Sequence, residues 1–402
     1  MSAVSQVRPI SEPGLDMGMS VLQVGAGWFP EFSAGGENVF YNLSRYLPAT
    51  GVDVRGLVVG SERAQAESEG RIVAFSPRSS SLLERMKSGR KAIIGSMARR
   101  NPDLLAVHFS LFGLPVIDKF GMRPLVVHFH GPWAAESELE GSGWLSVKTK
   151  EFIERAVYRR ADRVIVLSRA FGRLLCERYE IDPGRVRVVP GGVDCARFNV
   201  SATRAEARRQ LGWPADRPTI LAVRRLAKRM GLIELLGALK RVREQHANVH
   251  LVIAGKGDEG ENLKAFVAEH ELSDCVTFQG FVPDCDLPLV YRAADLSVVP
   301  STHLEGFGLI TAESLGAGTP VMVTPVGGLP ETVEGLGAQL VFASSRPNDM
   351  ADGLCGALAG SLRLPTQSEC IAFARRQFDW PVIARKTRAV YSEVLTETAG
   401  RA

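Results

Sequence analysis

The sequence predicts an α/β protein built from two doubly wound, Rossmann-like domains. From Ser20 onward, short β-type runs alternate with helical patterns, which is typical of parallel strands connected by crossover helices. A polar segment at 199–216 interrupts the alternation, and a second series begins with TILAVRRL at 219. The chain of 402 residues is also longer than one hydrophobic core usually supports. These three observations favour two domains of the same class.

The polar segment sets the expected domain boundaries. We expect a flexible leader at 1–18, a first domain at 19–200 and a second domain at 201–380. The leader contains charged residues but no apolar core, so we do not expect a secretory signal.

The composition is that of an ordinary globular protein, with 45% hydrophobic and 23% charged residues. None of the six cysteines forms a CxxC pair, which indicates reduced thiols and a cytoplasmic location. No apolar run approaches the roughly 18 residues of a membrane span. The net charge is +4, and we expect no nucleic-acid partner.

A glycine pair follows the first strand, VLQVG at 21–25. Gly35 and Gly36 stand at the start of the next helix, where unhindered backbone amides can meet an anion. A tight turn is the alternative role. Because ligands of open α/β sheets bind beyond the carboxyl ends of the strands, we expect a donor-binding loop here.

The segment 79–100 has the pattern of a basic amphipathic helix. Between Arg78 and Arg100 there are seven cations against Glu84 alone, and the apolar residues fall on one helical face. Such a helix can lie on an anionic bilayer, or it can pack on its own sheet with its charges in water. Both alternatives stay open at this point, including peripheral contact with the inner face of a membrane.

The run PLVVHFHGPW at 124–133 places His128 and His130 on the same face of a strand. Two histidines so placed can ligate a metal, but no third ligand with a recognisable spacing follows. We therefore expect both to be wall residues, with His130 at the strand end, and we expect no metal site.

The first strand of the second domain carries cations to its carboxyl end. Arg224 and Arg225 lie near the end of the run TILAVRRL. Lys228 and Arg229 follow before Gly231 starts a helix. Fixed cations at this place can stabilise the charge of a departing diphosphate. A solvated charge run is the alternative.

Two further motifs in the second domain are weak. GKGDEG at 255–260 fits a dinucleotide-binding turn, but the usual acidic residue about 20 positions further on is missing from its context. Asp284 and Asp286 spell DxD, a metal-binding pattern, yet their place at a helix start makes them N-cap residues by default.

The stretch PSTHLEGFGLITAESLGAGTPVMVTPVGGLPE at 300–331 is the most informative. It runs from the end of a buried strand through Gly306 and Gly308 into a helix that begins near Leu309, so free amides point at a ligand. Glu305 lies on the loop and Glu313 about one turn into the helix, so both can face one cleft. Carboxylates suit the vicinal hydroxyls of a sugar.

EGFGLITAE, followed by GTPV and GGLPE, resembles the E-x7-E signature of glycosyltransferase family 4. The resemblance implies the GT-B fold, a retaining and metal-independent mechanism, and a nucleoside diphosphate sugar as donor, with no further cofactor. It also implies that the last helix, 381–402, crosses back to the first domain. The acceptor would carry a hydroxyl, and some relatives use lipid-linked acceptors in glycan or glycolipid assembly.

The resemblance also implies roles for individual residues. Glu313 would bind the ribose and Glu305 the donor sugar, His130 would face that sugar, and the backbone near Val282 would border the base. The diphosphate would meet cations and backbone amides, namely Arg225, Lys228, Phe307, Gly308 and Leu309.

One departure from the family pattern GRL-x3-KG stands out, since Met230 occupies the lysine position. Lys228 or Arg229 would then have to supply the charge. Three alternatives to a transferase stay open: a nucleotide-sugar epimerase of the same fold, a GT-B phosphorylase, and a catalytically silent sugar-nucleotide-binding protein.

Overall fold

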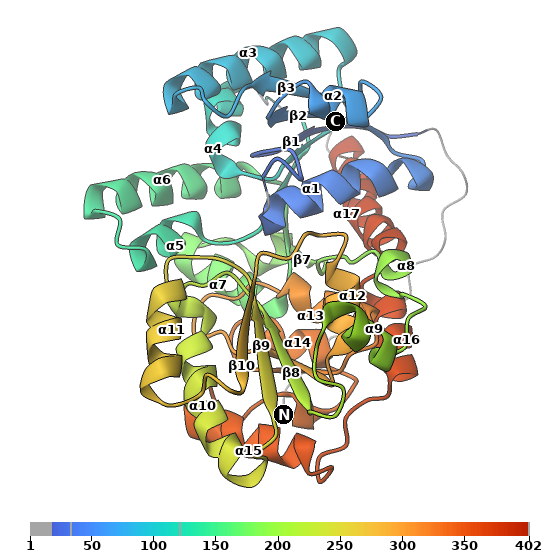
Figure 1. The fold of residues 1–402 in the computed structure, drawn as a ribbon. Coiled ribbons are helices and arrows are strands. Elements are labelled where there is room, and N and C mark those ends of the chain that lie inside the picture. The colour runs from blue at the N-terminus through green and yellow to red at the C-terminus, as the bar shows by residue number, and fades with distance from the viewer. Residues whose placement is uncertain (1–17, 33, 120, 122, 401–402) are drawn as a thin grey trace, which may run out of the picture.

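The computed structural model describes residues 18–400 except 33, 120 and 122. Most of the expected leader therefore lies outside the described residues. Two separate parallel sheets, each covered by helices, make up the fold (Figure 1). The predicted α/β class with two doubly wound sheets is confirmed.

The first sheet has seven strands in the order β3-β2-β1-β4-β5-β6-β7, all parallel. Alternate strand residues point to opposite faces of the sheet. The strands are β1 Ser20–Val24, β2 Asp53–Val59, β3 Ile72–Ser76, β4 Leu104–Val107, β5 Leu125–Phe129, β6 Arg163–Val166 and β7 Val186–Val188.

Two helical layers bury the faces of the first sheet. One hydrophobic cluster joins the sheet to α3, α4, α6 and α7, and another joins its opposite face to α1 and α17. The bounds here are α1 Gly35–Tyr46, α2 Arg63–Glu67, α3 Leu82–Arg100, α4 Ser110–Gly113, α5 Trp133–Leu139, α6 Trp144–Arg160, α7 Arg169–Tyr179, α8 Cys195–Phe198 and α17 Trp380–Ala399, with the short 3₁₀ helices η1 Pro48–Thr50, η2 Leu114–Lys119 and η3 Pro183–Arg185.

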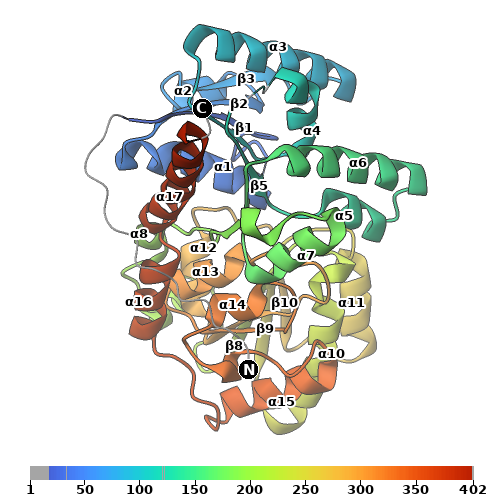
Figure 2. The same ribbon diagram turned by 180° about the vertical axis from the view of Figure 1, so that it is seen from behind.

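The last helix, α17, thus packs on the first sheet although it follows the second sheet in the chain (Figure 2). Trp380 and Tyr391 are both at most 2% exposed in this contact. The Tyr391 hydroxyl lies 2.8 Å from Nε2 of His128 on β5.

The second sheet has five parallel strands in the order β10-β9-β8-β11-β12. They are β8 Thr219–Val223, β9 His250–Ala254, β10 Val276–Gly280, β11 Leu296–Val299 and β12 Val321–Val323. The helices are α9 Arg204–Leu211, α10 Leu232–Gln245, α11 Gly260–Glu269, α12 Leu287–Ala293, α13 Leu309–Gly316, α14 Leu329–Val333, α15 Pro347–Leu358 and α16 Gln367–Gln377, with η4 Lys228–Met230 and η5 Ala338–Leu340.

The strand order places one switch point in each sheet. The chain moves outward in one direction from β1 and in the other from β4, and β8 and β11 play the same roles in the second sheet. Ligands of such sheets bind beyond the carboxyl ends of the strands at these points. Among the described residues, no helix is long and apolar enough to cross a membrane.

Candidate functional site

The switch point of the second sheet brings two loops into backbone contact. The loop after β8 includes Gly231, where an added Cβ would lie 1.7 Å from the carbonyl oxygen of Pro300 in the loop after β11. The amide of Thr302 also donates to the carbonyl of Arg229 at 3.0 Å. Gly231 has φ +73°, so glycine meets both the steric and the conformational requirement. The two loops are therefore held together by their backbones and form one side of the site.

The end of the loop between β11 and α13, Gly306 to Gly308, is buried where the two units of the fold meet. Gly306 packs on Phe171 of α7, and Phe307 is 3% exposed. Within the described residues, the amides of Phe307, Gly308 and Leu309 make no hydrogen bond. Buried amides are nearly always paired, so three consecutive unpaired ones at a helix N-terminus mark a place for an anionic acceptor.

Glu305 is an ionised carboxylate in this loop. Its Oε2 accepts hydrogen bonds from Nη2 of Arg224 at 2.8 Å and from the Ser301 hydroxyl at 3.0 Å. Burial alone would raise the pKa of Glu305, but the guanidinium of Arg224 and these hydrogen bonds hold it below the ordinary value. The side chain is 15% exposed, so part of it stays accessible.

Glu313 lies on α13 in different surroundings. Its Oε2 accepts a hydrogen bond from the Tyr291 hydroxyl at 3.0 Å. Burial raises the pKa of Glu313 to about 7, only partly opposed by that hydrogen bond. Near neutral pH this group can therefore carry a proton or give it up.

The predicted residues of the first sheet come together at the other side of the site. A Cβ on Gly35 would lie 3.7 Å from the Leu309 side chain, and one on Gly36 would lie 3.2 Å from the His130 ring. The first residues of α1 and α13 thus meet, with His130 beside them. Both helix N-termini carry partial positive charge towards the same place.

His130 is half-buried and belongs to a stack of three histidines, of which His108 and His128 are buried. Its Nε2 lies 3.1 Å from Nδ1 of His108, and the ring of His108 stacks on that of His128 at 4.0 Å. Burial lowers the pKa of His130 to about 4, so the ring is neutral at physiological pH. No group of three or more potential metal ligands occurs in the part of the chain that the structure describes.

The cations after β8 occupy unequal positions. Arg224 is 8% exposed, whereas Arg225 and Lys228 are exposed. Nη2 of Arg225 lies 3.2 Å from Glu140 at the end of α5. Arg229 donates to the carbonyl of Leu304 at 3.0 Å, beneath the loop that carries Glu305.

Sequence reasoning missed Glu136 and gave Arg224 no role of its own. Glu136 lies in the first turn of α5, 3.7 Å from Nη2 of Arg229 across the boundary between the units. Burial raises its pKa, partly offset by Arg229. The signal in the sequence was only an acidic residue shortly after a strand end.

Three other positions named in the sequence analysis lie in the segment between β10 and α12. Val282 packs against the hydrophobic core of the second sheet, next to Phe281, which is 62% exposed. Asp286 is the N-cap residue of α12, as predicted, although its side chain makes no capping hydrogen bond. The same prediction is wrong for Asp284, which is not a cap residue. Asp284 instead pairs with Arg197.

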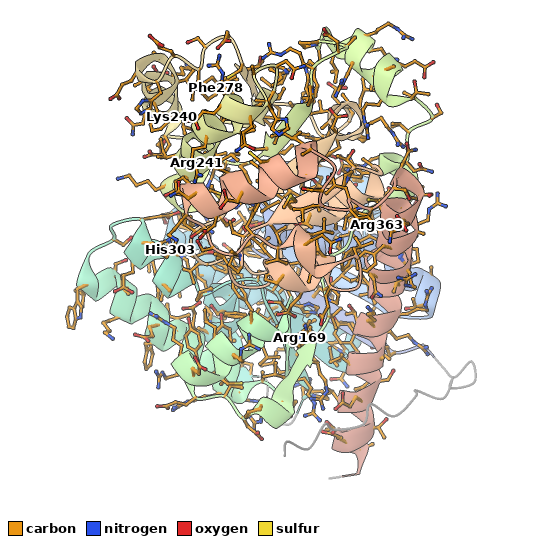
Figure 3. The ribbon with its side chains drawn as sticks, turned by 90° about the horizontal axis from the view of Figure 1, so that it is seen from below. Arg169, Lys240, Arg241, Phe278, His303 and Arg363 are labelled. Atoms are coloured by element: carbon orange, nitrogen blue, oxygen red, sulfur yellow. The ribbon has the colours of Figure 1, made fainter. Side chains whose placement is uncertain are left out.

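A second contact between the units lies at α7. Arg169, labelled in Figure 3, is the first residue of this helix. The backbone amides of Arg169 and Ala170 donate to the Glu331 carboxylate of α14 at 2.8 and 2.9 Å. The side chain of Arg169 also pairs with Glu334. The N-terminus of α7 is thus capped from the other unit.

Comparison with known proteins gives consistent matches over both halves. Residues 33–197 match the family described as "Glycosyltransferase Family 4", and residues 203–377 match the family described as "Glycosyl transferases group 1". The glycogen synthase of Mycobacterium tuberculosis is 30% identical over 308 residues, 74% of this chain and 70% of that protein. A D-inositol 3-phosphate glycosyltransferase of Actinosynnema mirum is 30% identical over 364 residues, 86% of this chain and 83% of that protein.

Solved structures share the fold. Sucrose-phosphate synthase from Thermosynechococcus elongatus superposes with a TM-score of 0.76 at 24% identity, covering 94% of this chain and all of that one. HepE from Anabaena, in complex with UDP-glucose, gives a TM-score of 0.75 at 20% identity, covering 93% of this chain and all of that one.

Proposed function

The chain belongs to glycosyltransferase family 4, with the GT-B fold, and on this premise we propose that it transfers a hexose from a nucleoside diphosphate sugar to a hydroxyl acceptor with retention. The observation that carries the proposal is the set of three unpaired amides, Phe307 to Leu309, beside the ionised Glu305. An anion and a polyhydroxylated group bound side by side would satisfy both.

In this proposal the donor spans the second sheet's switch point. Its diphosphate meets the amides at the start of α13, with Arg225 and Lys228 above them. Glu305 accepts hydrogen bonds from the sugar, and Glu313 from the ribose. His130 is neutral, so it faces the sugar as a hydrogen-bonding group and not as a charge.

The transfer then needs no covalent intermediate on the protein. The acceptor oxygen bonds to the anomeric carbon on the face from which the diphosphate departs, and the bond between that carbon and the diphosphate oxygen breaks. The leaving diphosphate takes the acceptor's proton. The amides and cations stabilise the charge that develops on the diphosphate, which is where electrostatic stabilisation is most effective.

A two-stage assay tests the proposal. Thermal shift with UDP-glucose, ADP-glucose and GDP-mannose identifies the donor base, because a ligand that binds the folded state raises Tm. Release of nucleoside diphosphate is then measured with and without hydroxyl acceptors. An epimerase would convert the donor without release, and a silent binding protein would show the shift but no release with any acceptor.

We further propose that the acceptor is presented at a lipid surface, through α6 more than through the segment 79–100. In α3 the buried residues are Gly89, Ile93 and Met97, so the middle of that helix packs on its own sheet. Leu82 and Leu83, at its start, are 50% and 69% exposed.

The larger exposed apolar surface is on α6. Trp144, Leu145 and Phe152 are 73%, 72% and 68% exposed, and their spacing places them on one side of the helix. The helix has five cations against two carboxylates, and α3 has six against one. Figures 1 and 2 show both helices in one layer over the first sheet. Apolar side chains within a basic layer suit an anionic phospholipid bilayer.

Trp144 makes this second proposal directly measurable, because Trp28, Trp213 and Trp380 are buried and Trp133 is partly buried. Vesicles of phosphatidylglycerol and phosphatidylcholine should shift the Trp144 emission to the blue and float the protein. Changing Trp144, Leu145 and Phe152 together to serine should abolish flotation. Flotation that survives this change, or that needs no anionic lipid, would contradict the proposal.

A further inference from the structure

Arg224 has unusual surroundings for a buried guanidinium. It follows β8 directly and is 8% exposed. Its Nη2 lies 2.6 Å from the Ser301 hydroxyl, 2.8 Å from Glu305 Oε2 and 2.6 Å from the thioether sulfur of Met230. All of these contacts use the same nitrogen.

The other two nitrogens of Arg224 have no partner within the described residues. Nε is buried without a hydrogen bond, and no hydrogen bond involves Nη1. A guanidinium carries five N–H donors in a fixed, planar fork. Leaving buried donors unpaired is costly, more so for a charged group, unless an anionic acceptor meets them.

Arg224 lies where it can bind the same anionic group as the unpaired amides of Phe307 to Leu309. β8 and β11 flank the switch point, and Arg224 and Glu305 join the loops that leave them. Arg225 and Lys228, which carry similar charge, are exposed, so water screens them more strongly. A buried cation at this edge interacts with a diphosphate in a lower dielectric.

We propose that Arg224 is a donor-binding residue of this enzyme, which holds the diphosphate through Nε and Nη1 and fixes Glu305 through Nη2. The proposal rests on the proposed function, since it takes the donor to be a nucleoside diphosphate sugar. Met230 belongs to the arrangement. Its thioether accepts the contact of Arg224 without adding a second cation, so the residues at 224 and 230 are coupled.

The first test separates the diphosphate from the rest of the donor. UDP, ADP and GDP, and the matching nucleosides, are titrated calorimetrically into the wild type and Arg224→Met. The variant should bind the recognised diphosphate about 10- to 100-fold more weakly, the effect of losing charge-assisted hydrogen bonds. Nucleoside binding should not change. If Arg224 had a merely structural role, its loss would weaken diphosphate and nucleoside binding together.

Arg241→Met is the matched control. Arg241 lies on α10, where its side chain is 44% exposed and pairs with Asp352 of α15 (Figure 3). It should bind the diphosphate like the wild type. If Arg224→Met does not fold, Arg224→Lys replaces it: at position 224 the lysine ammonium takes the place of Nη2 beside Glu305 and lacks the separate Nε and Nη1 donors of the guanidinium fork, so diphosphate binding should again fall while nucleoside binding stays.

The second test moves the cation from one residue to its neighbour. In the double variant Arg224→Met/Met230→Lys, the lysine at position 230 brings its ammonium towards Glu305. The double variant should bind the diphosphate at least about tenfold more tightly than Arg224→Met. Met230→Lys alone places two cations in contact and should lower Tm.

The outcomes distinguish the two levels of proposal. If the wild type binds none of the three diphosphates, the proposed function itself is wrong. If the wild type binds one and Arg224→Met binds it equally well, only the role of Arg224 is wrong. A double variant no better than Arg224→Met would overturn the coupling with Met230.

Discussion

Glu305 and Glu313 lie on the same short stretch of chain, yet their surroundings have opposite effects. The loop gives Glu305 a guanidinium and a hydroxyl, and its pKa falls below the ordinary value. Glu313, on the helix, accepts a hydrogen bond from the phenol of Tyr291, and burial raises its pKa to about 7. Burial acts on both, so the partner decides the charge. One stretch thus holds a permanently charged acceptor and one that titrates near neutrality.

Removing the charge of Glu305 should have the largest effect. Glu305→Gln leaves Arg224 buried without its counter-ion, and breaking such a pair costs about 3 kcal/mol or more. We expect a fall in Tm and a loss of transfer of at least about 100-fold, because the carboxylate is also proposed to hold the sugar. Denaturant unfolding and initial rates measure the two effects separately. Unchanged stability would mean that the pair with Arg224 contributes little.

Glu313→Gln should change stability in the opposite direction. The folded-state pKa of about 7 exceeds the ordinary value of 4.5, so the contribution of protonated Glu313 to stability is fully present below pH 4.5 and is lost as pH rises through 7. Above pH 7 the variant should be more stable than the wild type by up to about 3 kcal/mol. Urea unfolding at pH 5 and pH 8 measures the difference, which should shrink at the lower pH.

The same variant should bind the donor more weakly. Glutamine offers the ribose one acceptor oxygen in place of a carboxylate, so we expect KM for the donor to rise about tenfold with a smaller change in kcat. In the wild type, KM should also rise as pH falls below 7. A KM independent of pH would show that Glu313 does not meet the ribose as a carboxylate.

Tyr291→Phe tests the partner itself. Without the phenol, Glu313 loses the hydrogen bond that opposes its burial, and its pKa should rise further. The cost in stability should be about 1 kcal/mol, that of one hydrogen bond. The pH dependence of KM should move to higher pH in this variant and stay in place in Phe281→Leu, a change at an exposed ring near the same edge.

Arg225→Ala should give the smallest effect of the series. The side chain is exposed and its pair with Glu140 lies at the surface, so screening limits what it contributes. We expect turnover to fall several-fold, by less than about tenfold, with little change in donor binding. Rates at low and high salt measure it, and the difference from the wild type should shrink as salt rises.

The fold and the central stretch were predictable because their signals are local. Alternating patterns predicted both sheets, and the glycines before Leu309 predicted the start of α13 at that residue. The choice between Arg224 and Arg225 was not predictable, because neighbouring residues at a strand end point in opposite directions and tertiary contacts decide which one is buried. The position of Arg224 depends on Ser301 and Glu305, about 80 residues away. Arg225 instead meets Glu140 of the first half of the chain.

Contacts between distant elements limited the other predictions in the same way. The helix pattern at 79–100 was recognisable, but whether its apolar face meets a sheet or a bilayer depends on β-strands elsewhere in the chain. His128 and His130 were expected to share a face, and the ring of His108 between them comes from another strand. The roles of the individual site residues stay predictions that the experiments above test.

The return of α17 to the first sheet has a consequence for biosynthesis. One face of that sheet has only α1 as its cover until the chain from Trp380 onward has been translated, roughly 190 residues after β7, which at about 5–20 residues per second is on the order of 10–40 s. We expect the apolar residues that α17 helps to bury, such as Val21, Leu43 and Ile165, to be more exposed on the nascent chain during that interval. That surface would suit a holdase chaperone, since the first half of the molecule is completed only after the second half has been made.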